Sequence, residues 1–341
     1  MTVERQENNF DLIRLLAAAF VIFSHAFGIC GLKDPVLEFT GTLPGGQLAV
    51  YVFFVISGYL IAGSWFKRPK LIPYFEKRIL RIYPALIVVL LISIFIFGPI
   101  LTTLSLKEYF SASETYSYFI NLSLWKMQYS LPGVTMHGED LFFNTPIWTL
   151  FFEFIMYLSI AFLGMTGLLK NKREGRWILW LLFIAFLFLD FYGIPKELFI
   201  MKISAFNFVR FFIYFYSGVL YYLYLKDRKM SGYIAFVSIL AAIFYRDTVF
   251  FSFFSLVSIT TSVFWFAFLD YHPLKFIVSR GDFSYGLYIY GCIIQNFIQY
   301  YTGCSIPLMI KIPLSLALTF PFAIFSWRLI ESKFLKLKLR L

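Results

Sequence analysis

Ten apolar runs of roughly twenty residues recur along the chain, and they constrain its fold more than any other feature. A helix of about 20 apolar residues is long enough to cross the ~30 Å hydrocarbon core of a bilayer. Of the 341 residues, 60% are hydrophobic and only 14% are charged, whereas soluble domains are about a quarter charged. The runs therefore predict an all-α, polytopic integral membrane protein. The ten expected transmembrane helices lie near 12–30, 47–66, 78–101, 147–167, 176–193, 204–224, 231–246, 249–269, 283–301 and 306–329.

Lysine and arginine are distributed unevenly between the segments that separate these runs. With the N-terminus inside, the cytoplasmic segments hold 22 of the 30 Lys and Arg residues, and the other side holds 8. Positive residues gather on the cytoplasmic side of membrane proteins. We therefore predict that both termini are cytoplasmic and that the protein is a multi-pass protein of the plasma membrane, in bacteria the inner membrane. The excess of positive charge orients the chain in the bilayer and does not imply a nucleic-acid partner.

The intervals between the runs leave no room for a separate soluble domain. The longest one, 102–146, is too short for an independent fold and too long for a simple connector. Cys30, Cys292 and Cys304 show no metal-ligand spacing, so we predict small residues in or beside helices rather than a disulfide framework. The sequence thus predicts one membrane-embedded domain, 1–341, without a metal and with an oligomeric state that the pattern leaves open.

Ionisable residues fall inside several of the predicted spans, where charge is costly and usually serves a function. Arg14 and His25 are eleven residues apart, which places them on one helix face with ~16 Å between them. Counted at ~1.5 Å per residue from the outer ends, His25, Glu153 and Arg210 lie at a similar depth. We expect an imidazole, a carboxylate and a guanidinium to form one polar site. For Arg14 the alternative is an anchor at the interface, paired with Asp11 one turn earlier.

Two further motifs carry residues of interest. In FEKRILRIYP, Arg78 and Arg81 are three residues apart and share a helix face. Such a pair can clamp a phosphate or pyrophosphate, although anchoring on the cytoplasmic side explains it equally well. Ser57 and Gly58, in the second run, form a small pair that lets helices approach closely. A nucleophilic role for Ser57 has little support because no GxSxG turn surrounds it.

Six segments occur in an order that is specific as a set. They are FDLIRLLAAAFVIFSH with its Arg-x10-His spacing, GGQLAVYVFFVISGYLI, KRILRIYPA with its Arg-x-x-Arg, NTPIWTLFFEFIMY, VRFFIYFYSGVLYY and SRGDFSYGLYIYGCIIQ. In these segments, over nearly its full length, the chain resembles the membrane-bound acyltransferase 3 family. The resemblance implies a ten-helix core that takes an acyl group, commonly acetyl, from cytoplasmic acyl-CoA and passes it to a hydroxyl of a cell-surface or lipid-linked glycan.

The resemblance also implies roles for individual residues. The essential histidine of the family falls on His25, its partner arginine on Arg14 and its carboxylate on Glu153, which makes these the expected catalytic residues. The inner arginine pair falls on Arg78 and Arg81, which are expected to bind acyl-CoA. Apart from the resemblance, we expect Arg210, Ser57 and Trp148 to contact the acceptor substrate, with stabilisation of the developing oxyanion as the alternative role for Arg210.

Two positions depart from the pattern of the family. Many members have a histidine after SYGLYL, where this chain has Tyr290 and Gly291, so no second catalytic histidine is implied. Many members end on Glu-x-Pro, where this chain has Glu331, Ser332 and Lys333, so no role is implied for that tail.

The chemistry of His25 has two alternatives at this stage. The ring can act as a general base that deprotonates the acceptor hydroxyl, or it can be acylated and hand the group on. The acyl-CoA co-substrate, the hydroxyl acceptor and the lipid bilayer are the expected partners. A transporter or flippase for a glycan or small solute, in which His25, Glu153 and Arg210 relay protons or bind the solute, is the alternative function.

Overall fold

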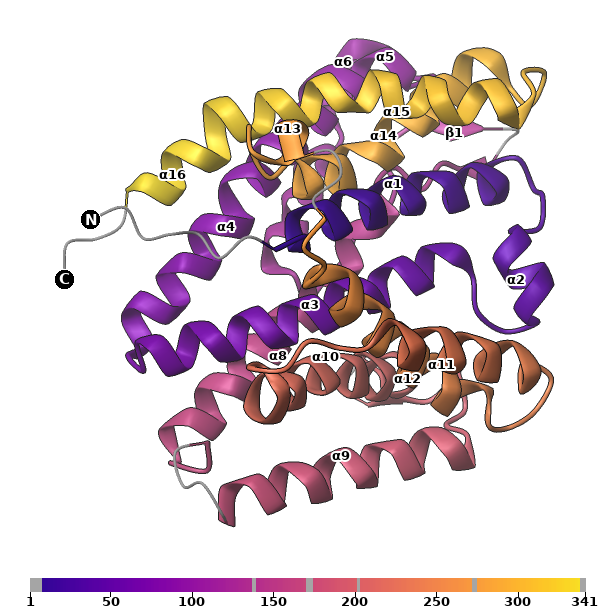
Figure 1. Cartoon of the computed structure of the whole chain (residues 1–341). Coiled ribbons are helices and arrows are strands. Elements are labelled where there is room, and N and C mark those ends of the chain that lie inside the picture. Colours follow the sequence, from indigo (N-terminus) through magenta and orange to yellow (C-terminus); the bar gives the residue numbers. More distant parts are fainter. Residues whose placement is uncertain (1–7, 137–138, 170–173, 201–202, 272–274, 338–341) are drawn as a thin grey trace. The chain divides into compact units, whose positions relative to one another are not determined.

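The computed structural model describes residues 8–136, 139–169, 174–200, 203–271 and 275–337, and its elements are almost all helices (Figure 1). The chain divides into two compact units. Unit 1 is made of Met1–Ala17, Val36–Tyr74 and Phe152–Lys275, and unit 2 is made of Ala18–Pro35, Phe75–Phe151 and Phe276–Leu341. Helices α1 (Phe10–Ile29), α4 (Leu71–Ile92) and α8 (Trp148–Met165) contribute residues to both units.

Unit 1 consists mainly of apolar helices that follow one another along the chain. Besides its parts of α1, α4 and α8, it contains one short hairpin that precedes α10. Its other elements are α2 (Pro35–Thr40), α3 (Gly45–Lys67), α9 (Glu174–Tyr192), β3 (Phe199–Ile200), β4 (Ile203–Ser204), α10 (Ala205–Leu225), α11 (Gly232–Phe244) and α12 (Phe251–Ala267).

Helices α3 and α10 of unit 1 pack closely against each other. A Cβ on Gly58 of α3 would lie 1.9 Å from the carbonyl oxygen of Phe215, and a Cβ on Gly218 of α10 would lie 2.0 Å from that of Val55. Only glycine fits on both sides of such a contact, as small residues do between membrane helices. The predicted packing role of Gly58 is therefore confirmed.

Aromatic rings fill the rest of this core. The rings of Phe54 and Phe211 stack with centroids 4.4 Å apart, and those of Tyr221 and Phe264 stack at 3.6 Å. Stacked pairs contribute about 0.5–1.5 kcal/mol each beyond their burial. They join α3 to α10 and α10 to α12, so they hold the helices that carry Arg210 and Ser57.

Unit 2 contains the remaining helices and the long interval between α4 and α8. That interval folds into short helices and a hairpin of two-residue strands, so it is not a simple connector. Tyr109 within it is fully buried and donates a hydrogen bond to the carbonyl of Ile94 at 2.9 Å. The interval contains the π-helical η1 (Ser93–Phe97), α5 (Gly98–Leu101), α6 (Leu106–Ser111), α7 (Ser113–Ser117), the 3-10 helix η2 (Tyr118–Ser123), β1 (Thr135–Met136), β2 (Glu139–Asp140) and the 3-10 helix η3 (Thr145–Ile147). The later elements of unit 2 are α13 (Lys275–Val278), α14 (Ser284–Thr302), α15 (Leu308–Phe325), the π-helical η4 (Ser326–Glu331) and α16 (Ser332–Lys336).

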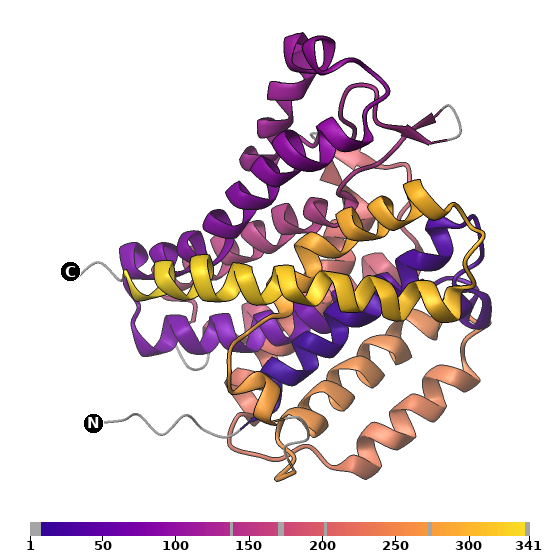
Figure 2. The same ribbon diagram turned by 90° about the horizontal axis from the view of Figure 1, so that it is seen from above.

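Helices α14 and α15 lie side by side in unit 2 (Figure 2). A Cβ on Gly286 would lie 2.7 Å from the Cα of Ala323, so the two backbones come close at this point. α14 is buried along most of its length even though it carries polar side chains such as Asn296. Asn296 donates to the carbonyl of Phe142 at 2.8 Å, which attaches the interval before α8 to this helix.

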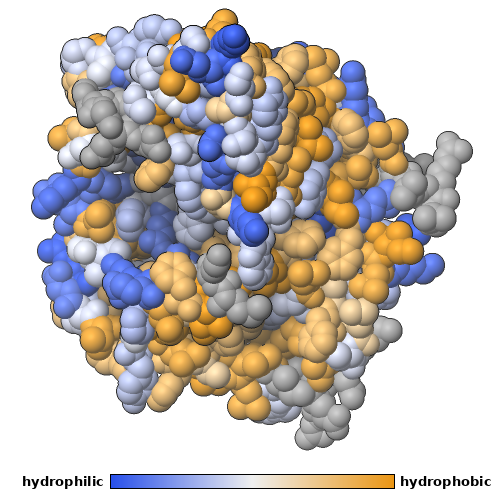
Figure 3. All heavy atoms as spheres, turned by 180° about the vertical axis from the view of Figure 1, so that it is seen from behind, coloured by the Kyte–Doolittle hydropathy of each residue, from blue (hydrophilic) through white to orange (hydrophobic). Residues whose placement is uncertain are grey.

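Six of the described helices are long and apolar enough to cross a membrane, and three shorter apolar helices accompany them. Each of the ten predicted spans coincides with a helix whose ends lie within a few residues of the prediction, except that α4 begins at Leu71 and the last helical run continues to Lys336. Hydrophobic side chains cover much of the face in Figure 3, as expected of a surface in contact with lipid. The prediction of a polytopic helical membrane protein is therefore confirmed, whereas the count of ten spans stays a prediction.

Candidate active site

His25 is half-buried on α1, in the part of that helix that belongs to unit 2. The carboxylate of Asp34 interacts electrostatically with it, and that carboxylate also accepts a hydrogen bond from Ser24. One turn before His25, the carbonyl of Ile22 accepts from the buried Gln295 side chain at 2.7 Å. A carboxylate beside an imidazole orients the ring and stabilises its protonated form, so Asp34 belongs to the candidate site. The sequence analysis missed it because Asp34 lies in the connection beyond the span.

Arg14 lies on the same helix, eleven residues before His25. Its guanidinium pairs with Asp11 one turn earlier, and both side chains are about a quarter exposed. The pairing with Asp11 is therefore confirmed. Whether Arg14 also takes part in catalysis stays a prediction.

Glu153 and Ser57, two of the predicted site residues, are in contact in unit 1. The Ser57 hydroxyl on α3 donates to the Glu153 carboxylate on α8 at 3.1 Å, and the Tyr157 hydroxyl, one turn further along α8, donates to the same oxygen. The carbonyl of Tyr157 in turn accepts from the buried Tyr74 hydroxyl at 2.9 Å. A carboxylate with two hydroxyl donors in a membrane span is held in a defined position, as a functional group must be.

Arg210 lies in a second polar cluster of unit 1. Its guanidinium pairs with Asp190 of α9 at 3.0 Å, lies over the ring of Phe206 at 4.4 Å and interacts with the hydroxyl of Tyr51. Asp190 also accepts a hydrogen bond from Ser252 of α12. The side chains of Arg210 and Asp190 are 17% and 6% exposed, so the pair is largely removed from solvent. Asp190 and Ser252 were not predicted, although Asp190 is the only carboxylate in the apolar run of α9 between Trp177 and Tyr192.

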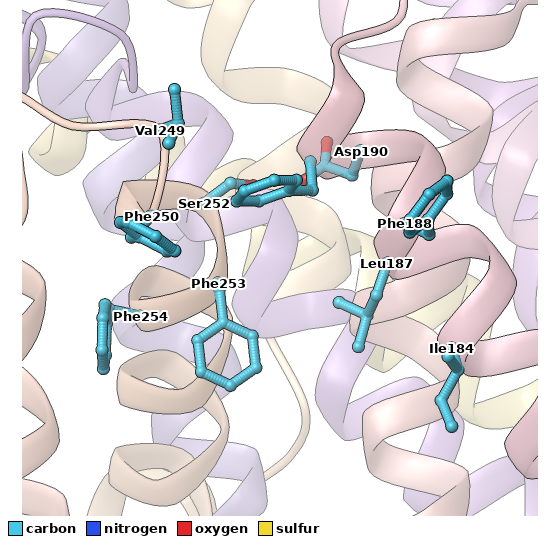
Figure 4. A pocket seen from close by; sticks show the side chains of 10 residues that line it. Ile184, Leu187, Phe188, Asp190, Val249, Phe250, Ser252, Phe253 and Phe254 are labelled. Atoms are coloured by element: carbon cyan, nitrogen blue, oxygen red, sulfur yellow. The ribbon is translucent and has the colours of Figure 1, made fainter.

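A pocket of about 530 Å³ opens beside this cluster, between α9 and α12 (Figure 4). Asp190 and Ser252 lie close together at one end of the pocket, and Leu187 and Phe253 face each other across it. Ligand pockets in proteins have about this volume and combine apolar walls with a few polar groups. The pocket is lined by Ile184, Leu187, Phe188, Asp190, Phe191, Val249, Phe250, Ser252, Phe253 and Phe254.

The residues next to Glu153 and Arg210 contact each other in unit 1. The ring of Phe152, next to Glu153, meets the ring of Phe211, next to Arg210, with centroids 5.1 Å apart. Each of the two charged groups nevertheless has its own partners, as described above. His25 belongs to unit 2, so its convergence with Glu153 and Arg210 stays a prediction.

Arg78 and Arg81 of α4, both in unit 2, differ in how far they are buried. Arg78 is buried, whereas Arg81 is partly exposed and binds two carboxylates, Asp282 before α14 at 2.7 Å and Glu331 in η4 at 3.1 Å. At least two of the five N–H donors of Arg81 are thereby used within the protein. A cation between two carboxylates attracts a phosphate less than a cation alone, because the carboxylates repel the phosphate. The phosphate-binding role that the resemblance implies for Arg78 and Arg81 stays a prediction.

Trp148, the remaining predicted residue, is half-buried and is the first residue of α8. The neighbouring Thr149 lies 2.6 Å from the hydroxyl of Tyr288 on α14, which fixes this end of α8 within unit 2. Within the part of the chain that the structure describes, no group of three or more His, Cys, Asp or Glu residues is arranged to hold a metal ion.

One family model and one known protein are similar to this chain over almost its whole length. The family model described as an acyltransferase domain, acyltransferase 3, matches residues 7–328. The chain is 31% identical to the O-acetyl transferase of Shigella phage Sf6 over 97% of its own length and 96% of that protein. It is 33% identical to nodulation protein 10 of Rhizobium leguminosarum bv. viciae over 46% of its length and 44% of that protein, and 32% identical to the acyltransferase MdmB of Streptomyces mycarofaciens over 33% and 27%. No solved structure matches the chain.

Proposed function

Because the chain belongs to the acyltransferase 3 family, we propose that it is a membrane O-acyltransferase that moves an acyl group, in the first place acetyl, from cytoplasmic acyl-CoA to a hydroxyl of a cell-surface or lipid-linked glycan. The observation that carries the proposal is the similarity, over 97% of the chain, to a protein named O-acetyl transferase. Membership of a family of acyltransferases decides against the transporter alternative.

The proposed architecture is one membrane-embedded domain of ten spans, with both termini in the cytoplasm of a bacterial cell. Ten helices at the ten apolar runs support it, together with the excess of Lys and Arg in the segments expected inside. Acyl-CoA is an anion made in the cytoplasm, so the inner ends of the helices are where its phosphates arrive. Arg78 and Arg81 start near that side, and we assign the phosphate contact to this pair.

His25 is the proposed general base. Its ring takes the proton of the acceptor hydroxyl, the hydroxyl oxygen attacks the thioester carbonyl, and the thiolate of CoA leaves. Asp34 is placed to stabilise the imidazolium that forms in this step, since it interacts with the ring electrostatically. Transfer through an acyl-histidine remains the alternative, and trapping of labelled enzyme after denaturation distinguishes the two.

The other site residues are assigned to the acceptor and to charge stabilisation. Glu153 and Arg14 complete the proposed catalytic set with His25, and Ser57 contributes through its hydrogen bond to Glu153. Arg210 is proposed to bind the acceptor, beside a pocket that offers space and apolar walls. Trp148 is proposed to stack on the acceptor, as aromatic rings do on sugars.

The test is an assay with the full-length protein in membranes, radiolabelled acetyl-CoA and a crude glycan extract. We expect thiol release together with transfer of label to the extract, and we expect His25→Ala to abolish both while the protein stays in the membrane. Near-normal turnover of His25→Ala would rule out the assigned role. Uptake of a solute by wild-type vesicles without thiol release would rule out the enzymatic function itself.

A further inference from the structure

Two of the three cysteines meet in unit 2, although they lie far apart in the sequence. Cys30 directly follows α1, and Cys304 lies in the turn between α14 and α15. The two thiols are hydrogen-bonded to each other, and both contact the side chain of Gln299, Cys30 through the amide oxygen at 3.6 Å and Cys304 through the amide nitrogen at 3.0 Å. Both thiols are reduced in the structure, Cys30 half-buried and Cys304 exposed.

A lysine lies beside this pair of thiols. Lys311, in the first turn of α15, is 2% exposed and places its Nζ 3.3 Å from the Cys30 sulfur. Its other acceptors are the amide oxygen of Gln299 and the carbonyl of Gly303, both neutral. Among the residues that the structure describes, no carboxylate pairs with Lys311. A buried cation needs a compensating negative charge, and a thiolate is the acidic group at hand.

The two thiols differ in how readily they ionise. Burial raises the pKa of Cys30 above its usual value. Partial burial also acts to raise the pKa of Cys304, but hydrogen bonds from Cys30 and Gln299 and the charge of Lys311 outweigh this effect and lower that pKa. Since the thiolate is the attacking species in disulfide exchange, the exposed Cys304 is the sulfur that reacts first.

We propose that Cys30 and Cys304 are a redox-active pair that forms an intramolecular disulfide on the extracytoplasmic side of the membrane. Both residues lie at the outer ends of their helices in the topology that the charge distribution predicts, and disulfides form and persist in that compartment. The inference does not depend on the acyl-transfer function.

The reaction needs an external disulfide as the oxidant, either that of an extracytoplasmic thiol oxidoreductase or oxidised glutathione. The Cys304 thiolate attacks one sulfur of that disulfide and releases one external thiolate, which leaves a mixed disulfide. Cys30 loses its proton to water and attacks the Cys304 sulfur, which releases the second external thiolate. Cys30 and Cys304 together lose two electrons and two protons, and the external disulfide is reduced to two thiols.

The bond would attach the outer end of α1 to the turn between α14 and α15. Cys30 is five residues beyond His25, so the disulfide would restrain the end of the helix that carries the proposed base. Cys292 offers a matched control, because it is buried in α14, contacts Thr145 and Asn296 at 3.6 Å, and is not part of the pair.

The test counts thiols in the full-length protein. Cells are quenched in acid, and the denatured protein is treated with a maleimide polymer before or after reduction. We expect the wild type to take up one polymer without reduction and three with it, and Cys292→Ser to take up none and then two. Cys30→Ser and Cys304→Ser are expected to take up two in both conditions. Three polymers on the unreduced wild type, or a disulfide-linked dimer in place of the intramolecular bond, would overturn the proposal.

A second measurement concerns Lys311. We follow the oxidation of reduced wild type and of Lys311→Met by glutathione disulfide in detergent. The variant is expected to react about threefold to tenfold more slowly, because less of the Cys304 thiol is ionised. An unchanged rate in a variant that keeps its fold would show that Lys311 does not activate the pair.

Discussion

At the scale of single residues, Arg81 has the clearest structural role in unit 2. It is the shared cation of two carboxylates, Asp282 and Glu331, whose side chains are 9% and 1% exposed. We predict that Arg81→Gln lowers the free energy of unfolding by about 3–5 kcal/mol, because it removes a cation that pairs with two buried carboxylates. Thermal unfolding in detergent measures the loss.

Lys229→Gln provides the control for this prediction. Lys229 pairs with Asp270 at 2.7 Å, but the two side chains are 68% and 88% exposed, and exposed pairs contribute only about 0–1 kcal/mol. If Arg81→Gln unfolded at the same temperature as Lys229→Gln, the two carboxylates would not depend on Arg81.

Glu153 allows a graded prediction for activity. Tyr157→Phe removes one hydroxyl donor from the carboxylate and keeps the ring. A hydrogen bond to a charged group is worth about 1.5–3 kcal/mol, so we expect kcat/KM to fall about tenfold or more in Tyr157→Phe, and further in Glu153→Gln, which removes the charge.

Tyr216→Phe is the matched control for Tyr157→Phe. Tyr216 of α10 donates to the Ser159 hydroxyl at 2.8 Å, whereas the described donors to Glu153 are Ser57 and Tyr157. Loss of the Tyr216 hydroxyl should therefore leave kcat/KM within about twofold. Equal losses in both variants would mean that the hydroxyl of Tyr157 acts on stability and not on the carboxylate.

At the scale of helices, the position of each helix along the chain could be predicted well from the sequence, but the residues that its side chains contact in other helices could not. Hydropathy is a local property, so a run of about twenty apolar residues identifies a helix without reference to the rest of the chain. The partners of Arg81 are 201 and 250 residues away in the sequence, and no local pattern indicates them. Glu331 was left without a role because Ser332 and Lys333 depart from the Glu-x-Pro pattern of the family, and its contact with Arg81 is not visible in the sequence. Gly58 was correctly placed in a close helix contact. The bond from the neighbouring Ser57 to Glu153 depends on how α3 packs against α8, which the spacing of residues does not determine.

The contact between α3 and α10 leads to a prediction at this scale. Because a methyl group on Gly58 would overlap the backbone of α10, and one on Gly218 the backbone of α3, the helices must move apart in Gly58→Ala and in Gly218→Ala. Overpacking usually costs about 1–3 kcal/mol, so we expect each variant to unfold at a lower temperature and to accumulate less in the membrane.

Gly28→Ala on α1 is the control variant for Gly58→Ala and Gly218→Ala, because a Cβ on Gly28 would meet no neighbouring atom within 4 Å. Alanine is the better helix former by roughly 0.5–1 kcal/mol, so this variant should match or exceed the wild type in stability. Destabilisation of Gly28→Ala as large as that of Gly58→Ala would remove the steric explanation.

At the scale of the whole molecule, the direction of each helix decides which residues can meet acyl-CoA and which can meet the outer compartment. The charge distribution predicts the direction of every span only if all ten helices cross the bilayer. Helix α9 is the first of three short apolar helices along the chain, and its apolar part, Leu179–Tyr192, is shorter than the length that spans a membrane most readily. If α9 did not cross, every later segment would change sides, and Cys304 would be cytoplasmic.

Single cysteines in a variant without native cysteines test this direction. Lys126 precedes α8 and Asp227 follows α10, and both residues are exposed. With α8, α9 and α10 all crossing, the two lie on opposite sides, so an impermeant maleimide should label Lys126→Cys in intact cells and Asp227→Cys only after permeabilisation. Lys70→Cys, between α3 and α4, calibrates the cytoplasmic response and does not depend on α9. Labelling of Asp227→Cys in intact cells would show that α9 stays on one side. The assignments of Arg210 and of Cys304, and with the latter the proposed extracytoplasmic disulfide, would then have to be withdrawn.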